Sequence, residues 1–172
     1  MKKHLIIGSP ISHSLSPRIH NYWFKENNID GDYIKNDIKE DEVGKIIQKI
    51  KTKEIYGMNV TVPYKQTVLP FLETKSEIAI KTNSVNTILN KNGKIHGDNT
   101  DVFGFEQSII KNKLDLKNKK VLIFGAGGVV PSIICGLINL NAGKIFITNR
   151  TLENAKKIKQ IFNFIEIIEW GK

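Results

Sequence analysis

A run of small residues between two regular segments is the clearest chemical signal in the sequence. The run Gly125-Ala126-Gly127-Gly128 follows an apolar stretch and precedes a helical pattern. Glycine lets the backbone turn tightly and approach a diphosphate, whose charge is bound by free N–H groups at the helix start. A tight turn without a ligand explains many glycine clusters, but the βαβ context favours dinucleotide binding. The predicted cofactor contacts here are Gly125, Ala126, Gly127, Gly128 and Val129.

The residues after the next strand indicate which dinucleotide is bound. A site for NAD usually carries an acid about 20 residues further on, where it holds the ribose 2′-hydroxyl. This chain has Asn149-Arg150-Thr151 and no acid. A guanidinium beside a hydroxyl suits a 2′-phosphate, so Asn149, Arg150 and Thr151 favour NADP. The alternative is that Arg150 is a surface residue and that Thr151 only caps the next helix.

Three further clusters, in the first part of the chain, are polar where turns or helix starts are expected. Residues 12–17 place several serines ahead of a helix, and residues 59–65 put an Asn, a Thr and a Lys around a strand end. Residues 97–101 set two acids and two other polar side chains ahead of an apolar helix. Taken singly, these clusters are explained equally well as an N-cap, a strand-end turn and a second N-cap.

The elements that must position these clusters alternate between strand and helix. In the first half, strands are predicted at residues 5–7, 33–38 and 56–62, and helices at 16–28 and 40–51. Ser16 is the predicted N-cap of the first helix, with Pro17 in its first turn. Two short helical stretches are predicted at 65–72 and 75–81, followed by a hairpin over 85–97 around the turn Asn90-Lys91-Asn92-Gly93.

The second half repeats the alternation and predicts a parallel sheet. After a helix at 100–112, the nearly all-apolar strand 120–124 is of the kind that is buried on both faces. Helices to about residue 140 and at 151–162 alternate with strands at 144–148 and 164–168. This βαβαβ order predicts the first half of a doubly wound α/β fold, of the Rossmann type. The last strand is then expected to form an exposed edge.

Composition excludes several classes of protein. Of the 172 residues, 40% are hydrophobic and 25% charged, which is typical of a globular chain. The net charge of +9 comes from lysines spread along the sequence, without a basic stripe interleaved with aromatics, which argues against nucleic-acid binding. No apolar run is long enough for a membrane span or a signal peptide, so we expect a cytoplasmic protein. Cys135 is the only cysteine and is predicted to be buried; no His/Cys cluster offers a metal site.

Taken together, the motifs resemble one family. In order, they are Ser14-x-Ser16-Pro17, Asn59-Val60-Thr61-Val62-Pro63-x-Lys65, Val85-Asn86-Thr87, Gly97-Asp98-Asn99-Thr100-Asp101, Gly125-Ala126-Gly127-Gly128 and Asn149-Arg150-Thr151. This order resembles that of shikimate dehydrogenases and covers nearly all of the chain. The resemblance implies NADPH-dependent reduction of 3-dehydroshikimate to shikimate, a step towards chorismate and the aromatic amino acids. It also implies a shikimate-binding catalytic domain at residues 1–100 and an incomplete NADP-binding Rossmann domain at 101–172.

The resemblance also implies roles for individual residues. Lys65 resembles the catalytic lysine that exchanges a proton with the reacting oxygen, and Asp101 resembles its carboxylate partner. Ser14 and Ser16 are similar to the pair that holds the substrate carboxylate, with Thr61 beside them. Asn86 is similar to the asparagine that contacts ring hydroxyls, and Glu77 falls, as a weaker match, where the family lines the cofactor side. A lysine positioned by an acid can protonate an alkoxide as it forms, so no metal is needed.

Some features depart from the family pattern. Val130 replaces the usual third glycine of the turn, which predicts a looser contact between helix and strand. The glutamine that closes the substrate pocket in the family, and the second half of its sheet, have no counterpart in the sequence. We therefore expect a gene fragment or a shortened form with poor activity, as a monomer or a homodimer. Two alternatives stay open: an NAD-dependent quinate/shikimate dehydrogenase, and an inactive remnant that still binds ligand.

Overall fold

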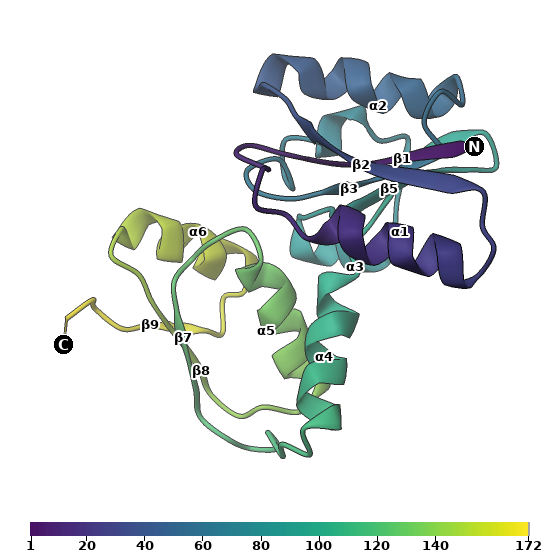
Figure 1. Ribbon diagram of the computed structural model, residues 1–172. Coiled ribbons are helices and arrows are strands. Elements are labelled where there is room, and N and C mark those ends of the chain that lie inside the picture. The colour runs from purple at the N-terminus through teal and green to yellow at the C-terminus, as the bar shows by residue number, and fades with distance from the viewer. Residues whose placement is uncertain (172) are drawn as a thin grey trace. The chain divides into compact units, whose positions relative to one another are not determined.

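The computed structural model describes residues 1–171; Lys172, the last residue of the predicted second domain, lies outside the described residues. The chain forms two compact units, Met1–Asn99 and Thr100–Lys172, and each is described by itself. Both combine helices with a sheet, which confirms the predicted α/β class (Figure 1).

The first unit contains a six-stranded mixed sheet with the order β2-β1-β3-β5-β6-β4. Strands β1 and β2, and β1 and β3, run parallel, whereas β3, β5 and β6 form antiparallel neighbours. The strands are β1 (Lys2–Gly8), β2 (Gly31–Asp37), β3 (Gly57–Val60), β4 (Thr74–Lys75), β5 (Thr87–Lys91) and β6 (Lys94–Asp98). The α-helices are α1 (Ser16–Glu26), α2 (Val43–Lys51) and α3 (Glu77–Thr82), with 3₁₀ turns at Glu40–Glu42 and Leu69–Phe71.

Alternation along β1 divides the apolar side chains of this unit between two faces of the sheet. Leu5 and Ile7 belong to the main core together with the apolar side of α2. Ile6 belongs to a smaller cluster with Ile11 and Tyr33 on the other face. Helices α1 and α2 accordingly cover opposite faces of the sheet (Figure 1). Burial of each such side chain contributes about 1.5–3 kcal/mol, so this alternation fixes the register of the strand.

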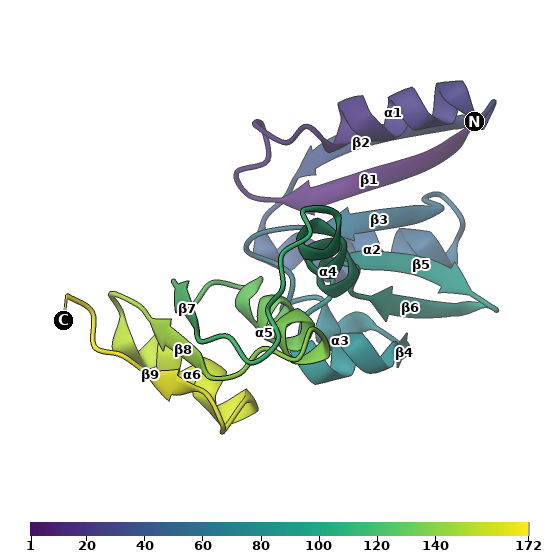
Figure 2. The ribbon, with the colours of Figure 1, turned by 90° about the horizontal axis from the view of Figure 1, so that it is seen from below.

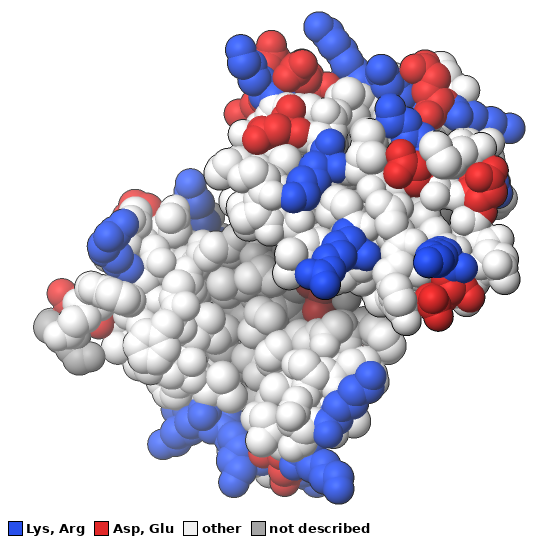
Figure 3. Space-filling model, viewed as in Figure 1, with Lys and Arg blue, Asp and Glu red and all other residues white. Residues whose placement is uncertain are grey.

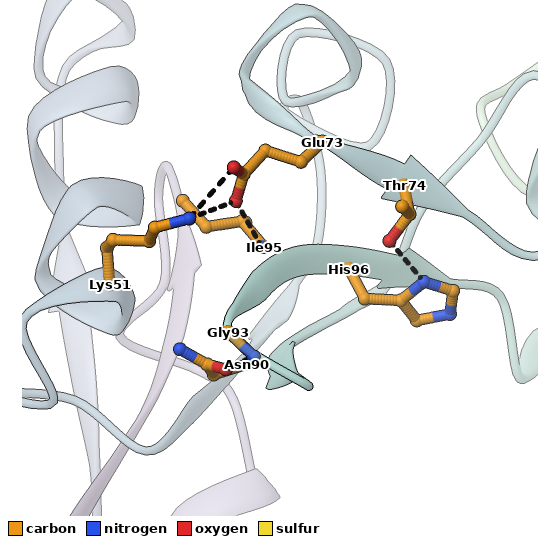
Figure 4. Close-up of polar contacts among 7 residues, drawn as sticks. All are labelled: Lys51, Glu73, Thr74, Asn90, Gly93, Ile95 and His96. Atoms are coloured by element: carbon orange, nitrogen blue, oxygen red, sulfur yellow. Dashed lines mark hydrogen bonds and ion pairs between the residues drawn. The ribbon is translucent and has the colours of Figure 1, made fainter.

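The β5–β6 hairpin is confirmed, and a carboxylate links it to α2 (Figure 4). Gly93 donates its N–H to the Asn90 side chain at 2.9 Å and has φ +80°, the region that glycine tolerates. Glu73 accepts from the Lys51 ammonium at 2.8 Å and from the N–H of Ile95 at 2.6 Å. These two bonds, the first the larger cause, lower the pKa of the Glu73 carboxyl. Glu73 therefore joins the helix to the sheet.

The second unit begins with α4 (Asp101–Lys111) and continues as βαβαβ, as predicted. Its further elements are β7 (Val121–Phe124), α5 (Val130–Asn139), β8 (Ile145–Thr148), α6 (Leu152–Ile161) and β9 (Glu166–Ile167). The strands pair in parallel in the order β7-β8-β9 and lie side by side in Figure 2. Helix α5 packs closely on α4, because a Cβ at Gly136 would lie 2.6 Å from the Phe105 ring. Cys135 is buried in α5, as predicted.

The prediction that β7 is buried on both faces is wrong. Leu122 and Phe124 are 42% and 75% exposed, although the two residues alternating with them are half-buried. Strand β7 lies at one edge of the described sheet, and no described element covers the face from which Leu122 and Phe124 project. The apolar composition of β7 fits a strand covered on both faces, but in this structure one of its faces is exposed. The predicted edge position of the last strand, β9, is confirmed.

Two local predictions in the first unit are also wrong. Residues 65–72 form turns and a 3₁₀ segment instead of an α-helix, because Pro70 has no N–H for the carbonyl of Gln66, which accepts from Leu69 at 3.0 Å instead. Ser16 is the first residue of α1 and not its N-cap. The Ser16 N–H instead donates to the hydroxyl of Ser14, at 3.3 Å.

Charged side chains of both signs are interspersed over the face of the first unit shown in Figure 3. That distribution agrees with a solvated surface and not with a basic stripe. Among the described residues, no helix combines the length and the apolar character that crossing a bilayer requires.

Candidate active site

Thr61 lies at the carboxyl end of β3, beside the end of β1. Its N–H donates to the carbonyl of Ile7 at 2.9 Å, and the N–H of Ser9 donates to the carbonyl of Val62 at 3.1 Å. A Cβ at Gly8 would lie 2.5 Å from the Thr61 methyl carbon and 3.0 Å from the Val62 carbonyl oxygen. Only glycine therefore permits the close approach that positions Thr61.

Backbone hydrogen bonds bring Lys65 and Asn86 to the same end of the sheet. The N–H of Val60 donates to the carbonyl of Asn86 at 2.8 Å, and the N–H of Val85 donates to the carbonyl of Lys65 at 2.9 Å. Both Lys65 and Asn86 are half-buried. The structure thus brings together three of the predicted site residues: Thr61, Lys65 and Asn86.

Ser14 and Ser16 form a pair where α1 begins. The Ser14 hydroxyl donates to the Ser16 hydroxyl at 3.2 Å. Their loop leaves the sheet at the carboxyl end of β1, which is also where Thr61 lies, and the N–H of Ile11 in this loop donates to the Asp37 carboxylate at 3.3 Å. Two adjacent hydroxyls at a helix start can bind a carboxylate.

Helix α1 is held in place by an asparagine that the sequence analysis did not single out. None of the residues of α1 is buried, so apolar burial alone does not fix the helix. The Asn21 side chain accepts from the N–H of Tyr33 and donates to its carbonyl, both at 2.9 Å. This pair of bonds ties α1 to β2 and so positions Ser14 and Ser16. Periodicity gives no signal for such a contact.

Two further predicted residues, Asp101 and Glu77, stand at the starts of helices α4 and α3. Asp101 is the first residue of α4 in the second unit, whereas Lys65 is in the first unit. Asp101 follows Asn99, whose buried side chain donates to the Thr82 hydroxyl at 3.1 Å and to the Ser84 carbonyl at 3.0 Å. Glu77 is exposed in the first turn of α3. The roles of Asp101 and Glu77 stay predictions.

The glycine turn in the second unit has the shape that the sequence predicts. The N–H of Gly125 donates to the carbonyl of Thr148 at 2.8 Å, and Gly125 has φ +109°, which requires glycine. A Cβ at Gly127 or Gly128 would meet no atom of the chain within 4 Å. Packing of the chain therefore does not require glycine at these two positions, whereas close approach of a diphosphate would.

The segment 149–151 is attached to this turn by Asn149. The Asn149 side chain accepts from the N–H of Ala126 at 3.1 Å and donates to the carbonyl of Thr151 at 2.7 Å. Thr151 occupies the N-cap position of α6, but its side chain makes no capping hydrogen bond. Arg150 and Thr151 are both exposed. Asn149 thus holds the two loops together, and the side chains of Arg150 and Thr151 face solvent.

A buried hydroxyl next to the turn supports a ligand here. Thr148 is 5% exposed, and its hydroxyl is the one buried side-chain polar atom of the described residues with no hydrogen-bond partner. Such groups in native proteins usually have a partner in a ligand or a water. This hydroxyl and the open space at Gly127 and Gly128 fit a dinucleotide at the carboxyl ends of β7 and β8.

Comparisons with known proteins cover both units. The shikimate dehydrogenase substrate binding domain model matches residues 6–88, and the shikimate / quinate 5-dehydrogenase model matches residues 108–169. A shikimate dehydrogenase (NADP(+)) of Pelagibacter ubique is 48% identical over 99% of this chain and 64% of its own length. One of Nitrosopumilus maritimus is 38% identical over 99% of this chain and 65% of its own length.

Solved structures agree with the sequence relatives. Shikimate dehydrogenase from Aquifex aeolicus matches with a TM-score of 0.91 and 34% identity, over 98% of this chain and 62% of that one. The Thermus thermophilus enzyme, solved in complex with NADP(H) and shikimate, matches with a TM-score of 0.87 and 27% identity, over 98% of this chain and 63% of that one. The chain thus spans a little under two thirds of these relatives. It belongs to the shikimate dehydrogenase family.

Proposed function

We propose that the protein catalyses the reversible, NADPH-dependent reduction of 3-dehydroshikimate to shikimate, a step towards chorismate and the aromatic amino acids. The observation that carries this proposal is the grouping of Thr61, Lys65 and Asn86 at one end of the sheet in a chain of this family. The first unit would bind shikimate and the second would bind NADP. The reaction belongs in the cytoplasm.

The side chains of the first unit have the chemistry that this substrate needs. The hydroxyls of Ser14, Ser16 and Thr61 donate to the substrate carboxylate, and Asn86 binds a ring hydroxyl. Lys65 gives a proton to the ketone oxygen as it becomes an alkoxide, and takes it back in the reverse direction. Asp101 positions the Lys65 ammonium beside the reacting oxygen.

The second unit carries the residues that would hold the cofactor. When bound, NADPH supplies the hydride that the substrate carbon accepts. Gly125 to Val129 would bind the diphosphate through backbone N–H groups, and Arg150 with Thr151 would bind the 2′-phosphate. Asn149 would keep these two loops at a fixed separation through its bonds to Ala126 and Thr151. Glu77 remains a proposed contact on the cofactor side.

The test follows absorbance at the NADPH band for this chain mixed with shikimate and NADP, beside a Lys65→Ala variant. Absorbance that rises with the parent chain and not with Lys65→Ala supports the proposal. Substituting NAD for NADP, or quinate for shikimate, distinguishes the NAD-dependent quinate/shikimate alternative.

A second candidate function is binding without turnover. It is favoured by one fact: the chain spans only 64% of the length of its Pelagibacter relative. In that case absorbance stays flat for both proteins, while shikimate or NADP still raises the melting temperature of the chain. Loss of both signals would contradict both candidate functions.

A further inference from the structure

A series of side-chain hydrogen bonds ends on Asn86, the proposed contact to a ring hydroxyl. The Tyr33 hydroxyl, on β2, donates to the Asn59 side-chain oxygen at 2.6 Å. The Asn59 side-chain nitrogen donates to the Thr87 hydroxyl at 3.1 Å and to the backbone carbonyl of Asn86 at 3.2 Å. The Thr87 hydroxyl in turn donates to Oδ1 of Asn86 at 2.9 Å.

The backbone carbonyl of Asn86 sets the orientation of the Asn59 amide at the centre of the series. A carbonyl only accepts, so the Asn59 atom that faces it must be the amide nitrogen. The Asn59 oxygen then faces Tyr33 and accepts the phenolic proton. The Thr87 hydroxyl accepts from Asn59 and gives its own proton to Oδ1 of Asn86. Hydroxyl protons aligned in one direction also strengthen one another.

We propose that Tyr33, Asn59 and Thr87 are positioning residues that fix the amide orientation of Asn86. With Oδ1 of Asn86 bound to Thr87, the Nδ2 amide group points away from Thr87 and presents N–H donors. Asn86 therefore selects an oxygen acceptor, such as a ring hydroxyl of the substrate, over a donor. This inference rests on the proposed function only in naming the acceptor as a shikimate hydroxyl.

The first member of the series is held rigidly. Tyr33 is 2% exposed, and its ring stacks on His20 with centroids 4.2 Å apart and planes 4° apart. Burial raises the pKa of the Tyr33 hydroxyl, which keeps it protonated and able to donate. Asn59 and Thr87 face each other as a β3–β5 pair, so the strands themselves hold them in register.

The positions of Asn59 and Thr87 in the sequence already indicate that they lie close to the candidate site. Asn59 stands two residues before Thr61, and this spacing places both side chains on one face of an extended segment. Thr87 stands next to Asn86 in the family motif. Asn59 and Thr87 both belong to the motifs that resemble those of the family. Tyr33 is distant in the sequence, so its contact with Asn59 could not be predicted from spacing.

The test compares Thr87→Val with Thr87→Ser in the full chain. Valine keeps the branched shape but removes the hydroxyl, whereas serine keeps the hydroxyl. NMR of ¹⁵N-labelled protein reads the side-chain amide of Asn86, identified as the resonance pair missing in Asn86→Ser. Titration with shikimate, followed by calorimetry, reads binding.

We expect Thr87→Val to shift the Asn86 amide resonances and to weaken shikimate binding about tenfold, the effect of one hydrogen bond. Thr87→Ser and the parent chain should agree in both measurements, and Tyr33→Phe should shift the same resonances by less. A Thr87→Val protein with parental Asn86 resonances would overturn the inference. Absence of shikimate binding by the parent chain would overturn the proposed function instead, and the resonances would still decide the orientation of Asn86.

Discussion

At the scale of single residues, the candidate site depends on side chains that do no chemistry. Thr61 is placed by the absence of a side chain at Gly8, and Asn86 is oriented by Thr87. Thr61 and Asn86 became candidates because the motifs that contain them resemble those of shikimate dehydrogenases. The residues that hold them are recognisable only from distances, since the same residue types are common in ordinary turns.

The first prediction concerns Gly8. Gly8→Ala places a Cβ 2.5 Å from the Thr61 methyl carbon and 3.0 Å from the Val62 carbonyl, and the carbonyl belongs to a backbone that cannot easily move. We expect a loss of about 1–3 kcal/mol in the free energy of unfolding, measured by urea denaturation. The matched control is Gly57→Ala in β3, where the nearest atoms lie at 3.4 and 3.8 Å and the loss should be small. Equal losses would contradict the steric explanation.

The second prediction concerns pH. Burial, the largest cause, lowers the pKa of His20 and of His4 from 6.5 in the folded chain. At a pH between the lowered pKa and 6.5, the unfolded chain binds more protons than the folded chain. The free energy of unfolding therefore falls as the pH falls below about 6.5, and this contribution of the histidines is fully present above that pH. We expect His20→Phe, which keeps a ring against Tyr33, to reduce the fall in melting temperature between pH 7.5 and 5.5. A His20→Phe protein whose melting temperature falls as much as that of the parent would contradict this explanation.

At the scale of elements, the hydrophobic periodicity of the sequence predicted most helices and strands, but it did not predict the contacts that hold each element in place. The start of α1 was predicted correctly at Ser16 from the Ser-Pro pair, yet the capping role given to Ser16 was wrong. The helix is tied to β2 by Asn21, a contact that depends on the fold and not on local pattern. The failed helix at 65–72 has a local cause, Pro70, that the sequence did contain.

The third prediction separates two roles of glycine in the turn before α5. Gly125→Ala forces a side chain into φ +109° and should lower stability by about 1–3 kcal/mol. The Cβ added by Gly127→Ala meets no atom of the chain within 4 Å, so the free energy of unfolding of this variant should equal that of the parent. If the turn binds a diphosphate, Gly127→Ala should nevertheless weaken NADPH binding about tenfold or more, measured by fluorescence titration. Parental NADPH affinity in a stable Gly127→Ala protein would contradict the proposed cofactor contact.

At the scale of the whole molecule, the alternation of strands and helices predicted the α/β class, and the order of motifs predicted the family. Burial of β7 was not predictable in this way, because it depends on which layers cover a sheet and not on the strand itself. The apolar residues of β7 satisfy the pattern of a covered strand, while Leu122 and Phe124 face solvent. The contrast identifies a surface of the second unit that is apolar and exposed.

The last prediction follows from that surface. Leu122 and Phe124 line a groove of about 360 Å³ with Ile168 and Trp170, and exposed apolar grooves at a sheet edge promote association. We expect the apparent mass of the 19.5 kDa chain, measured by sedimentation velocity, to increase with protein concentration. Phe124→Lys should abolish this increase. It should not lower the melting temperature, because Phe124 is 75% exposed. Phe103, 65% exposed on α4 and outside the groove, provides the matched control. A Phe103→Lys protein should still associate; if it behaves like Phe124→Lys, general charge and not the β7 groove governs association.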